Sequence, residues 1–207
     1  MRVPLRRGSP AEAHIKGEGI RQFLAWYTAK WGEQRLHQFL ESLPPEAREV
    51  FDVDKPSLGI IASAWYPAHA FHALIDAMLS IYPADQRRLF AREAARATIL
   101  ATLRGVYKFL FEAMMTPDRY LGRAQKLFSR FYDTGTIEKT RVARNIHRSV
   151  IRGWTSHHPV LCDVMLYMGE YVYPALGCKN VTATRITCVS SGDPDCSYDV
   201  SWDLVQR

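Results

Sequence analysis

Residues 188–202 read CVSSGDPDCSYDVSW, a dense turn followed by the clearest strand of the chain. From Cys196 to Leu204, larger and mostly apolar side chains alternate with Ser and Asp, the pattern of a strand with one buried face. Turn-forming residues fill positions 190–195. The β-branched stretch 181–189 comes just before them and predicts another strand. Together these segments predict a C-terminal hairpin.

A second hairpin is predicted over residues 136–152, where β-branched residues alternate in part and the chain turns near residues 144–145. Between the hairpins, residues 158–176 have helical periodicity, and Gly177 provides a C-terminal stop. Two C-terminal hairpins separated by a helix predict a small antiparallel sheet, with the N-terminal helices packed on it. The predicted fold class is α+β.

The N-terminal part of the chain has helical periodicity interrupted by Pro and Gly. Helices are predicted over residues 14–40, 46–51, 67–79, 86–115 and 116–132. Gly105, inside the long fourth helix, predicts a close approach of another backbone or a ligand. Residues 1–13 are basic, contain Pro and Gly, and are predicted to be a mobile leader. At 207 residues, the chain is expected to form one domain over residues 14–207.

Composition excludes several classes of protein. With 47% hydrophobic and 23% charged residues, the chain is neither disordered nor collagen-like. Basic residues interrupt its most apolar stretches, so no run reaches the roughly 18 residues of a membrane span. The basic N-terminus lacks the apolar segment of a signal peptide. Four cysteines do not make a secreted disulfide scaffold, and we expect a cytoplasmic protein.

The net charge of +6 raises nucleic acid as a partner. The densest basic run, residues 139–152, coincides with the hairpin predicted over residues 136–152. No helix-turn-helix, zinc-finger or base-stacking motif accompanies it, which argues against nucleic-acid binding. The basic residues are interpreted as solvent-exposed faces of a helix and a hairpin. The alternative is a surface that binds an acidic protein partner.

Three cysteines are predicted to converge. Cys188 and Cys196 flank the final turn and would lie nearly opposite one another, and Cys162 lies on the helix that must cross the sheet. Three thiolates from a helix and two strands suit a tetrahedral zinc site that needs one more ligand. The candidates for that ligand are Cys178, His157 and His158. The alternative reading is three buried small hydrophobic residues.

Three segments carry a resemblance to a known family. They are YPALGCKNVTATRITCVSSGDPDCSYDVSW (173–202), SAWYPAHAFHALIDAM (63–78) and FYDTGTIE (131–138). Over residues 15–204 the chain resembles the 4-vinyl-reductase-type ligand-binding domains, and more specifically a myxobacterial paralogous family of unknown function. The resemblance implies an α+β fold shared with vesicle-tethering subunits and haem-based nitric-oxide sensors, commonly dimeric.

The resemblance also bears on the metal. In phenol-sensing transcriptional activators with this domain type, three cysteines and a glutamate hold zinc, and their cysteine pattern maps onto Cys162, Cys188 and Cys196. The glutamate position falls three residues before Cys188, where this chain has Arg185. The fourth ligand must therefore differ if zinc binds here.

Aromatic residues predict a pocket between the helices and the sheet, of the kind that holds a small apolar ligand. The predicted pocket residues are Trp65, Tyr66, Tyr107, Phe111, Trp154 and Tyr167. Haem is argued against, because no Tyr-x-Ser-x-Arg clamp is present. The candidate haem ligands His69, His72 and His147 are interpreted as packed or surface side chains.

The leading hypothesis is a non-enzymatic sensory domain that binds a small apolar molecule, or relays a signal, through a dimer, with the clustered cysteines fixing the helix to the last hairpin with or without zinc. The sequence contains neither a dinucleotide-binding fingerprint nor a nucleophile elbow, so no such motif supports an enzyme. Two alternatives stay open: an enzyme or carrier of tetrapyrrole metabolism, and a protein–protein adaptor without a ligand.

Overall fold

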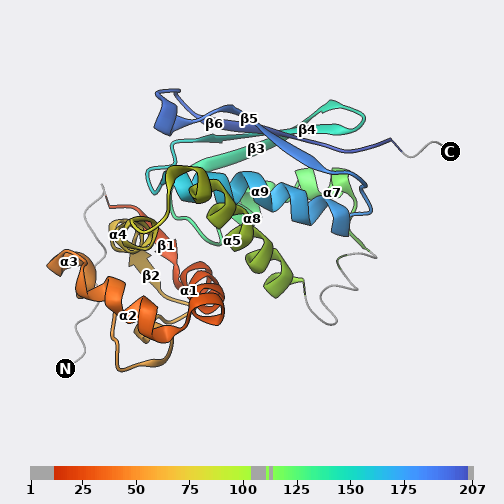
Figure 1. The fold of residues 1–207 in the computed structure, drawn as a ribbon. Coiled ribbons are helices and arrows are strands. Elements are labelled where there is room, and N and C mark those ends of the chain that lie inside the picture. Colours follow the sequence, from red (N-terminus) through yellow and green to blue (C-terminus); the bar gives the residue numbers. More distant parts are fainter. Residues whose placement is uncertain (1–11, 104–110, 112–113, 205–207) are drawn as a thin grey trace.

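The computed structural model describes residues 12–103, 111 and 114–204. An antiparallel sheet covers one side of the long helix α9, and the N-terminal helices pack on the other side (Figure 1). The helices are α1 (Gly17–Trp31), α2 (Glu33–Glu41), α3 (Pro45–Arg48), α4 (Ala68–Leu79), α5 (Arg87–Thr102), α7 (Pro117–Leu121), α8 (Ala124–Phe128) and α9 (Pro159–Ala175). The strands are β1 (His14–Lys16), β2 (Trp65–Pro67), β3 (Thr136–Ala143), β4 (Ile146–Arg152), β5 (Thr182–Thr187) and β6 (Cys196–Ser201).

The main sheet has the strand order β3-β4-β6-β5, with every neighbouring pair antiparallel. It consists of the two predicted hairpins, which meet where β4 pairs with β6. The α+β prediction is confirmed, including the helix between the hairpins. Alternation in the strands turns one side chain in two toward α9, as in Cys196, Tyr198 and Val200 of β6, all of which are buried.

Helix α9 fits this sheet closely because of one glycine. Gly169 faces β6, and a Cβ atom at this position would lie 2.7 Å from Cγ2 of Val200. The helix begins at Pro159, where the ring of His158 accepts a hydrogen bond from the amide of Val160. As predicted, it ends just before Gly177, whose φ of +85° suits a residue without a Cβ atom.

The N-terminal helices differ from the prediction at several places. The helix predicted over residues 14–40 begins at Gly17 and breaks at Gly32, whose φ of +87° separates α1 from α2. The residues before α1 form β1, which pairs with β2 in a second small sheet. Strands of three residues are too short to show a period in the sequence. The segment predicted as one helix over 116–132 is two short helices, α7 and α8.

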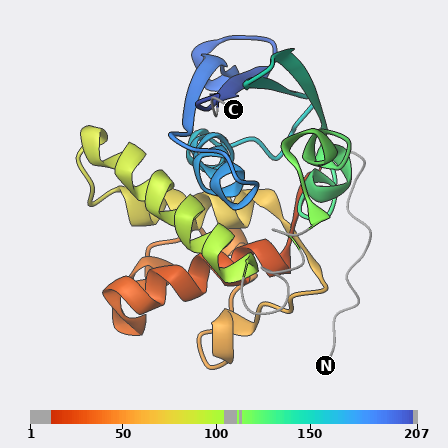
Figure 2. The same cartoon turned by 90° about the vertical axis from the view of Figure 1, so that its right-hand side faces the viewer.

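Helix α5 ends at Thr102, before the predicted end at residue 115. The prediction about Gly105 and most of the predicted 1–13 leader fall outside the described residues. Figure 2 shows α9 between the sheet and the N-terminal helices, with α5 crossing beside it. In the described part of the chain, no helix combines the length and apolarity needed to cross a membrane.

Candidate functional site: a cysteine–histidine cluster beside an apolar pocket

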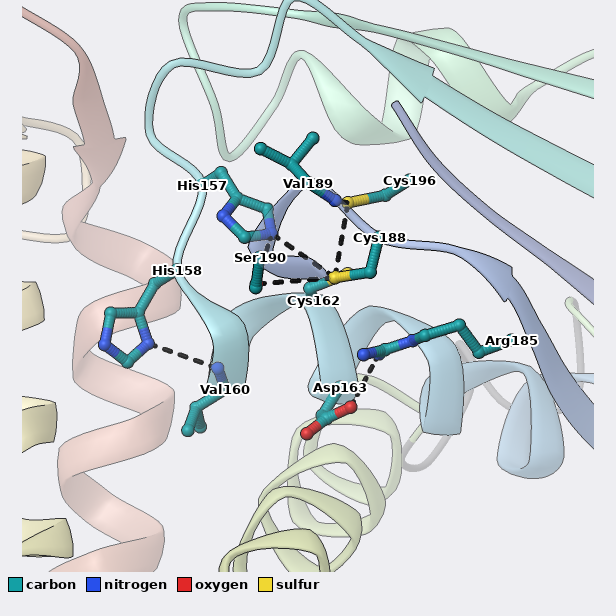
Figure 3. A network of polar contacts seen from close by, with 10 residues as sticks. All are labelled: His157, His158, Val160, Cys162, Asp163, Arg185, Cys188, Val189, Ser190 and Cys196. Carbon is teal, nitrogen blue, oxygen red and sulfur yellow. Dashed lines mark hydrogen bonds and ion pairs between the residues drawn. The ribbon is translucent and has the colours of Figure 1, made fainter. Parts of the chain in front are cut away.

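Four metal-ligand side chains meet where the end of the last hairpin lies over the start of α9 (Figure 3). They are Cys162, Cys188, Cys196 and His157, and their ligand atoms all lie within 4.8 Å of one another. Sγ of Cys188 lies 3.7 Å from Sγ of Cys162, 3.9 Å from Sγ of Cys196 and 3.9 Å from Nε2 of His157. The three cysteines are buried and free.

The turn between β5 and β6 positions two of these thiols. Gly192 adopts φ of +92°, which turns the chain back toward β6. The Asp193 carboxylate then accepts a hydrogen bond from the amide of Cys188, at 2.8 Å. The amide of Val189 donates to Sγ of Cys196 at 3.4 Å. Cys188 and Cys196 thus face each other, as the sequence spacing predicts.

The electrostatics favour a thiolate at Cys196 and a neutral thiol at Cys162. Hydrogen bonding with Cys162, and more weakly with His157, lowers the pKa of Cys196 to about 4. The same hydrogen bond with Cys196, together with burial, raises the pKa of Cys162. The pKa of His157 is raised by its hydrogen bonds to Cys196 and Cys188. Because the thiolate is the form of cysteine that binds metal, Cys196 is the cysteine of the cluster whose surroundings suit that role best.

The distances are compatible with a tetrahedral zinc site. Four ligands arranged tetrahedrally around zinc, with Zn–S bonds of about 2.3 Å, place the sulfur atoms about 3.8 Å apart. The observed separations of 3.7 and 3.9 Å are close to that value. A set of three cysteines and one histidine is also a common structural zinc set.

The structure distinguishes the candidates for the fourth ligand. His158 is engaged elsewhere, because its ring contacts Asp76 and the amide of Val160. Cys178 lies outside the cluster. Arg185, at the position where the phenol-sensing activators that the chain resembles carry glutamate, pairs with Asp163 at 2.6 Å (Figure 3). His157 therefore completes the set in this chain.

A second feature is a partly open apolar pocket of about 230 Å³ lined by α5, α7, α8, α9 and the sheet. Ile99, Phe128, Met165, Val172 and Tyr198 are among its lining residues. An outer groove of about 1040 Å³ shares several lining residues with it, including Phe111 and Leu127. Three arginines and one glutamate line that groove: Arg119, Arg123, Arg130 and Glu18.

Of the predicted pocket residues, the structure brings Phe111 to the pocket. Trp65 stacks under Lys16, the Tyr66 hydroxyl accepts a hydrogen bond from the amide of Ile61, and Arg92 covers the ring of Tyr167. Trp154 is buried beside Phe128, Tyr132 and His157, close to the cysteine cluster. Tyr107 lies outside the described residues.

Sequence reasoning missed Lys139, which lines the pocket. The basic run containing it was expected to form a solvated surface. A signal was present, because Lys139 has the same parity as Ile137 in the strand and so shares its inward face.

Several solved structures share this arrangement of helices and strands. An H-NOX protein from S. oneidensis in the Fe(II)NO state matches with a TM-score of 0.63 at 12% identity, over 91% of this chain and 99% of that one. An Fe(II) unliganded H-NOX protein from K. algicida matches at 0.63 and 11%, over 93% and 98%. A T. tengcongensis H-NOX matches at 0.66 and 10%, over 91% and 98%. The fold is that of the H-NOX domains.

This likeness concerns the fold alone, since the identities are near 10%. No protein-family model matches the sequence, and a search of curated proteins found no match either. The fold relation to haem-based nitric-oxide sensors, implied by the sequence resemblance, agrees with the structural matches.

The matches correct the expectation about haem. Haem was argued against, but solved structures with this fold are haem proteins, including those used to study haem distortion in the H-NOX family. Neither a missing clamp motif nor an interpretation of the histidines as packed or surface side chains decides what a fold can hold.

The described residues indicate which side chains could ligate the iron of a haem. None of the described histidines lines the pocket or the groove. His147 is hydrogen-bonded to the Tyr173 hydroxyl and His72 to the carbonyl of Ser156, and His69 forms an ion pair with Glu12. The pocket lining does offer tyrosine and methionine, both of which haem iron accepts. These residues are Tyr120, Tyr132, Tyr198, Met165 and Met168.

Proposed function

We propose that this chain is a non-enzymatic sensory domain that binds a small apolar molecule between α5, α8, α9 and the sheet. The observation that carries the proposal is the apolar pocket of about 230 Å³, whose lining is mostly aliphatic and aromatic with a few polar tips. Concave apolar pockets with a few polar groups are where proteins hold small molecules. The H-NOX-like fold is compatible with this role.

We also propose that a structural zinc ion is held by Cys162, Cys188, Cys196 and His157. The support is the match between the S–S separations and tetrahedral zinc geometry. Bound zinc would supply a cross-link and no reaction chemistry. His157 and Cys162 would fix the start of α9, and Cys188 and Cys196 would fix the last hairpin over it, so the clamp would hold two elements that flank the pocket.

The resemblance to 4-vinyl-reductase-type domains supports the same function, since domains of that type bind small molecules. It also underlies the proposal of a homodimer. The pocket of about 230 Å³ is too small for a whole haem, so haem would also have to occupy the adjoining outer groove. In that case Tyr120, Tyr132, Tyr198, Met165 and Met168 are the described pocket side chains that could ligate its iron. That ligand would give the domain gas-binding chemistry.

The test is to identify what the protein carries when purified from cells. We expect mass spectrometry of a denatured extract to release a small apolar compound in stoichiometric amount, while the absorbance spectrum of the folded protein identifies or excludes haem. A tetrapyrrole released together with nicotinamide-dependent turnover would favour the enzyme or carrier alternative. A chain that carries no compound, and binds none from a library of small aromatic and aliphatic molecules, would contradict the proposal and favour the adaptor.

A further inference from the structure

Lys139 lies on the inner face of the sheet, where a charged residue is unusual. In the register of the sheet it is opposite Ser149 of β4, which is opposite Tyr198 of β6. Ser149 and Tyr198 are both buried. Lysine, hydroxyl and phenol thus form a polar row across a face that otherwise packs on α9.

The Lys139 ammonium is surrounded by aromatic rings. Nζ lies 5.1 Å from the ring centroid of Tyr120, 5.4 Å from that of Tyr198 and 5.9 Å from that of Tyr173. Cation–π contacts offset part of the cost of partial burial, but they supply no hydrogen-bond acceptor, and no side chain in the described part of the chain accepts from this ammonium.

The ammonium also lacks a counter-ion in the part of the chain that the structure describes. The nearby carboxylates are engaged with other groups: Glu138 pairs with Arg152, and Asp118 with Arg141. Burial lowers the pKa of Lys139 to about 8, so the group still carries its charge at neutral pH. A half-buried positive charge that lines an apolar pocket, and has no ion-pair partner among the described residues, favours binding of an anion there.

The pocket around Lys139 limits the size of that anion. A volume of about 230 Å³ is roughly one and a half times that of an apolar cavity that accepts benzene, about 150 Å³. Apart from Lys139 and the tyrosines, the lining is mainly apolar. The outer groove, with three arginines against one glutamate, would favour the approach of an anion.

We infer that the ligand of this pocket is a small apolar monocarboxylic acid, with one ring or a short chain, whose carboxylate pairs with the Lys139 ammonium while its apolar part packs among Met165, Val172 and Phe128. This inference rests on the proposed function, because it names the chemical class of the ligand for the same pocket.

The experiment measures binding of matched acids and amides by ligand-observed NMR and calorimetry. The probes are benzoate, 4-methylbenzoate and hexanoate, each paired with its neutral primary amide of nearly the same shape. The proteins are wild type, Lys139→Met and Lys126→Met. Lys126 is an exposed lysine on α8, so its substitution is the matched control for loss of one positive charge.

For wild type and Lys126→Met we expect at least one acid to bind about tenfold or more tightly than its amide. In Lys139→Met this preference should disappear, while the amide binds as well as before. Retained amide binding also shows that the variant is folded.

Two results would overturn the inference and are distinguishable. If the amides bind wild type as well as the acids, or the preference survives in Lys139→Met, the ligand class is wrong and the proposed function stands. If neither acids nor amides bind wild type, the inference fails, and the extract and wider library then decide the proposed function separately.

Discussion

Substitution of Cys196 is a direct test of the proposed zinc site. In Cys196→Ser a structural zinc would lose one of four ligands, and we expect the free energy of unfolding to fall by about 3 kcal/mol or more. Cys178→Ser is the control, because Cys178 is a half-buried cysteine outside the cluster and its substitution should cost about 1 kcal/mol. Urea unfolding, with zinc content measured on the same samples, checks both. Equal and small effects would leave Cys196 as a packing residue.

His147 is a second residue with a specific consequence. It is buried on β4, where Nδ1 lies 2.9 Å from the Tyr173 hydroxyl. Burial lowers the pKa of His147 to about 4; Asp118 opposes this effect, and Lys139 and Arg141 add to it. In the unfolded chain, the imidazole of this histidine is protonated with the usual pKa of about 6.5. Between these values the unfolded state binds more protons, so stability falls as the pH falls.

From this follows a difference between wild type and His147→Asn. On going from pH 7 to pH 5, wild type should lose about 2 kcal/mol more unfolding free energy than the variant, which has no imidazole to protonate. Urea unfolding at the two pH values measures it. Equal losses in the two proteins would show that His147 does not resist protonation in the fold.

Among the elements, the contact between α9 and the sheet depends on Gly169. In Gly169→Ala the new methyl group would collide with Val200, and this overpacking should outweigh the gain in helix propensity. We expect a net loss of about 1–2 kcal/mol in thermal or urea unfolding. Gly122→Ala is the matched control, since its nearest contact is an ordinary 3.9 Å and its φ is negative. A neutral Gly169→Ala would mean that α9 can move away from β6 at little cost.

The elements also differ in how well the sequence predicts them. Alternation in residues 196–201 and the turn at 190–195 were sufficient for the last hairpin, because a strand with one buried face has a clear period. The break at Gly32 was not predicted, since a glycine within helical periodicity can be tolerated or can end the helix. The pairing of β1 with β2 joins residues about fifty positions apart and depends on tertiary packing.

The candidate site also has parts that the sequence predicts and parts that depend on tertiary packing. Convergence of Cys162, Cys188 and Cys196 followed from placing a helix across a hairpin. The choice of His157 over Cys178 and His158 could not be made from sequence, because it depends on where the loop before α9 crosses the hairpin. Lys139 was missed because a charged residue in a strand usually faces solvent.

At the scale of the whole molecule, the homodimer is a prediction drawn from the family resemblance. Light scattering coupled to size exclusion should give twice the 23.7 kDa mass of one chain, independent of loading over a tenfold concentration range. A constant mass of one chain would contradict the dimer while leaving the pocket and the zinc clamp untouched.

The measurement that tests the central claim most directly is the native mass of the protein as purified, compared with its denatured mass. The proposed zinc clamp, which would hold α9 and the last hairpin beside the pocket, predicts an excess of one zinc ion per chain, lost in Cys196→Ser and retained in Cys178→Ser. A wild-type chain without metal, which takes up no zinc when zinc is supplied, would contradict it.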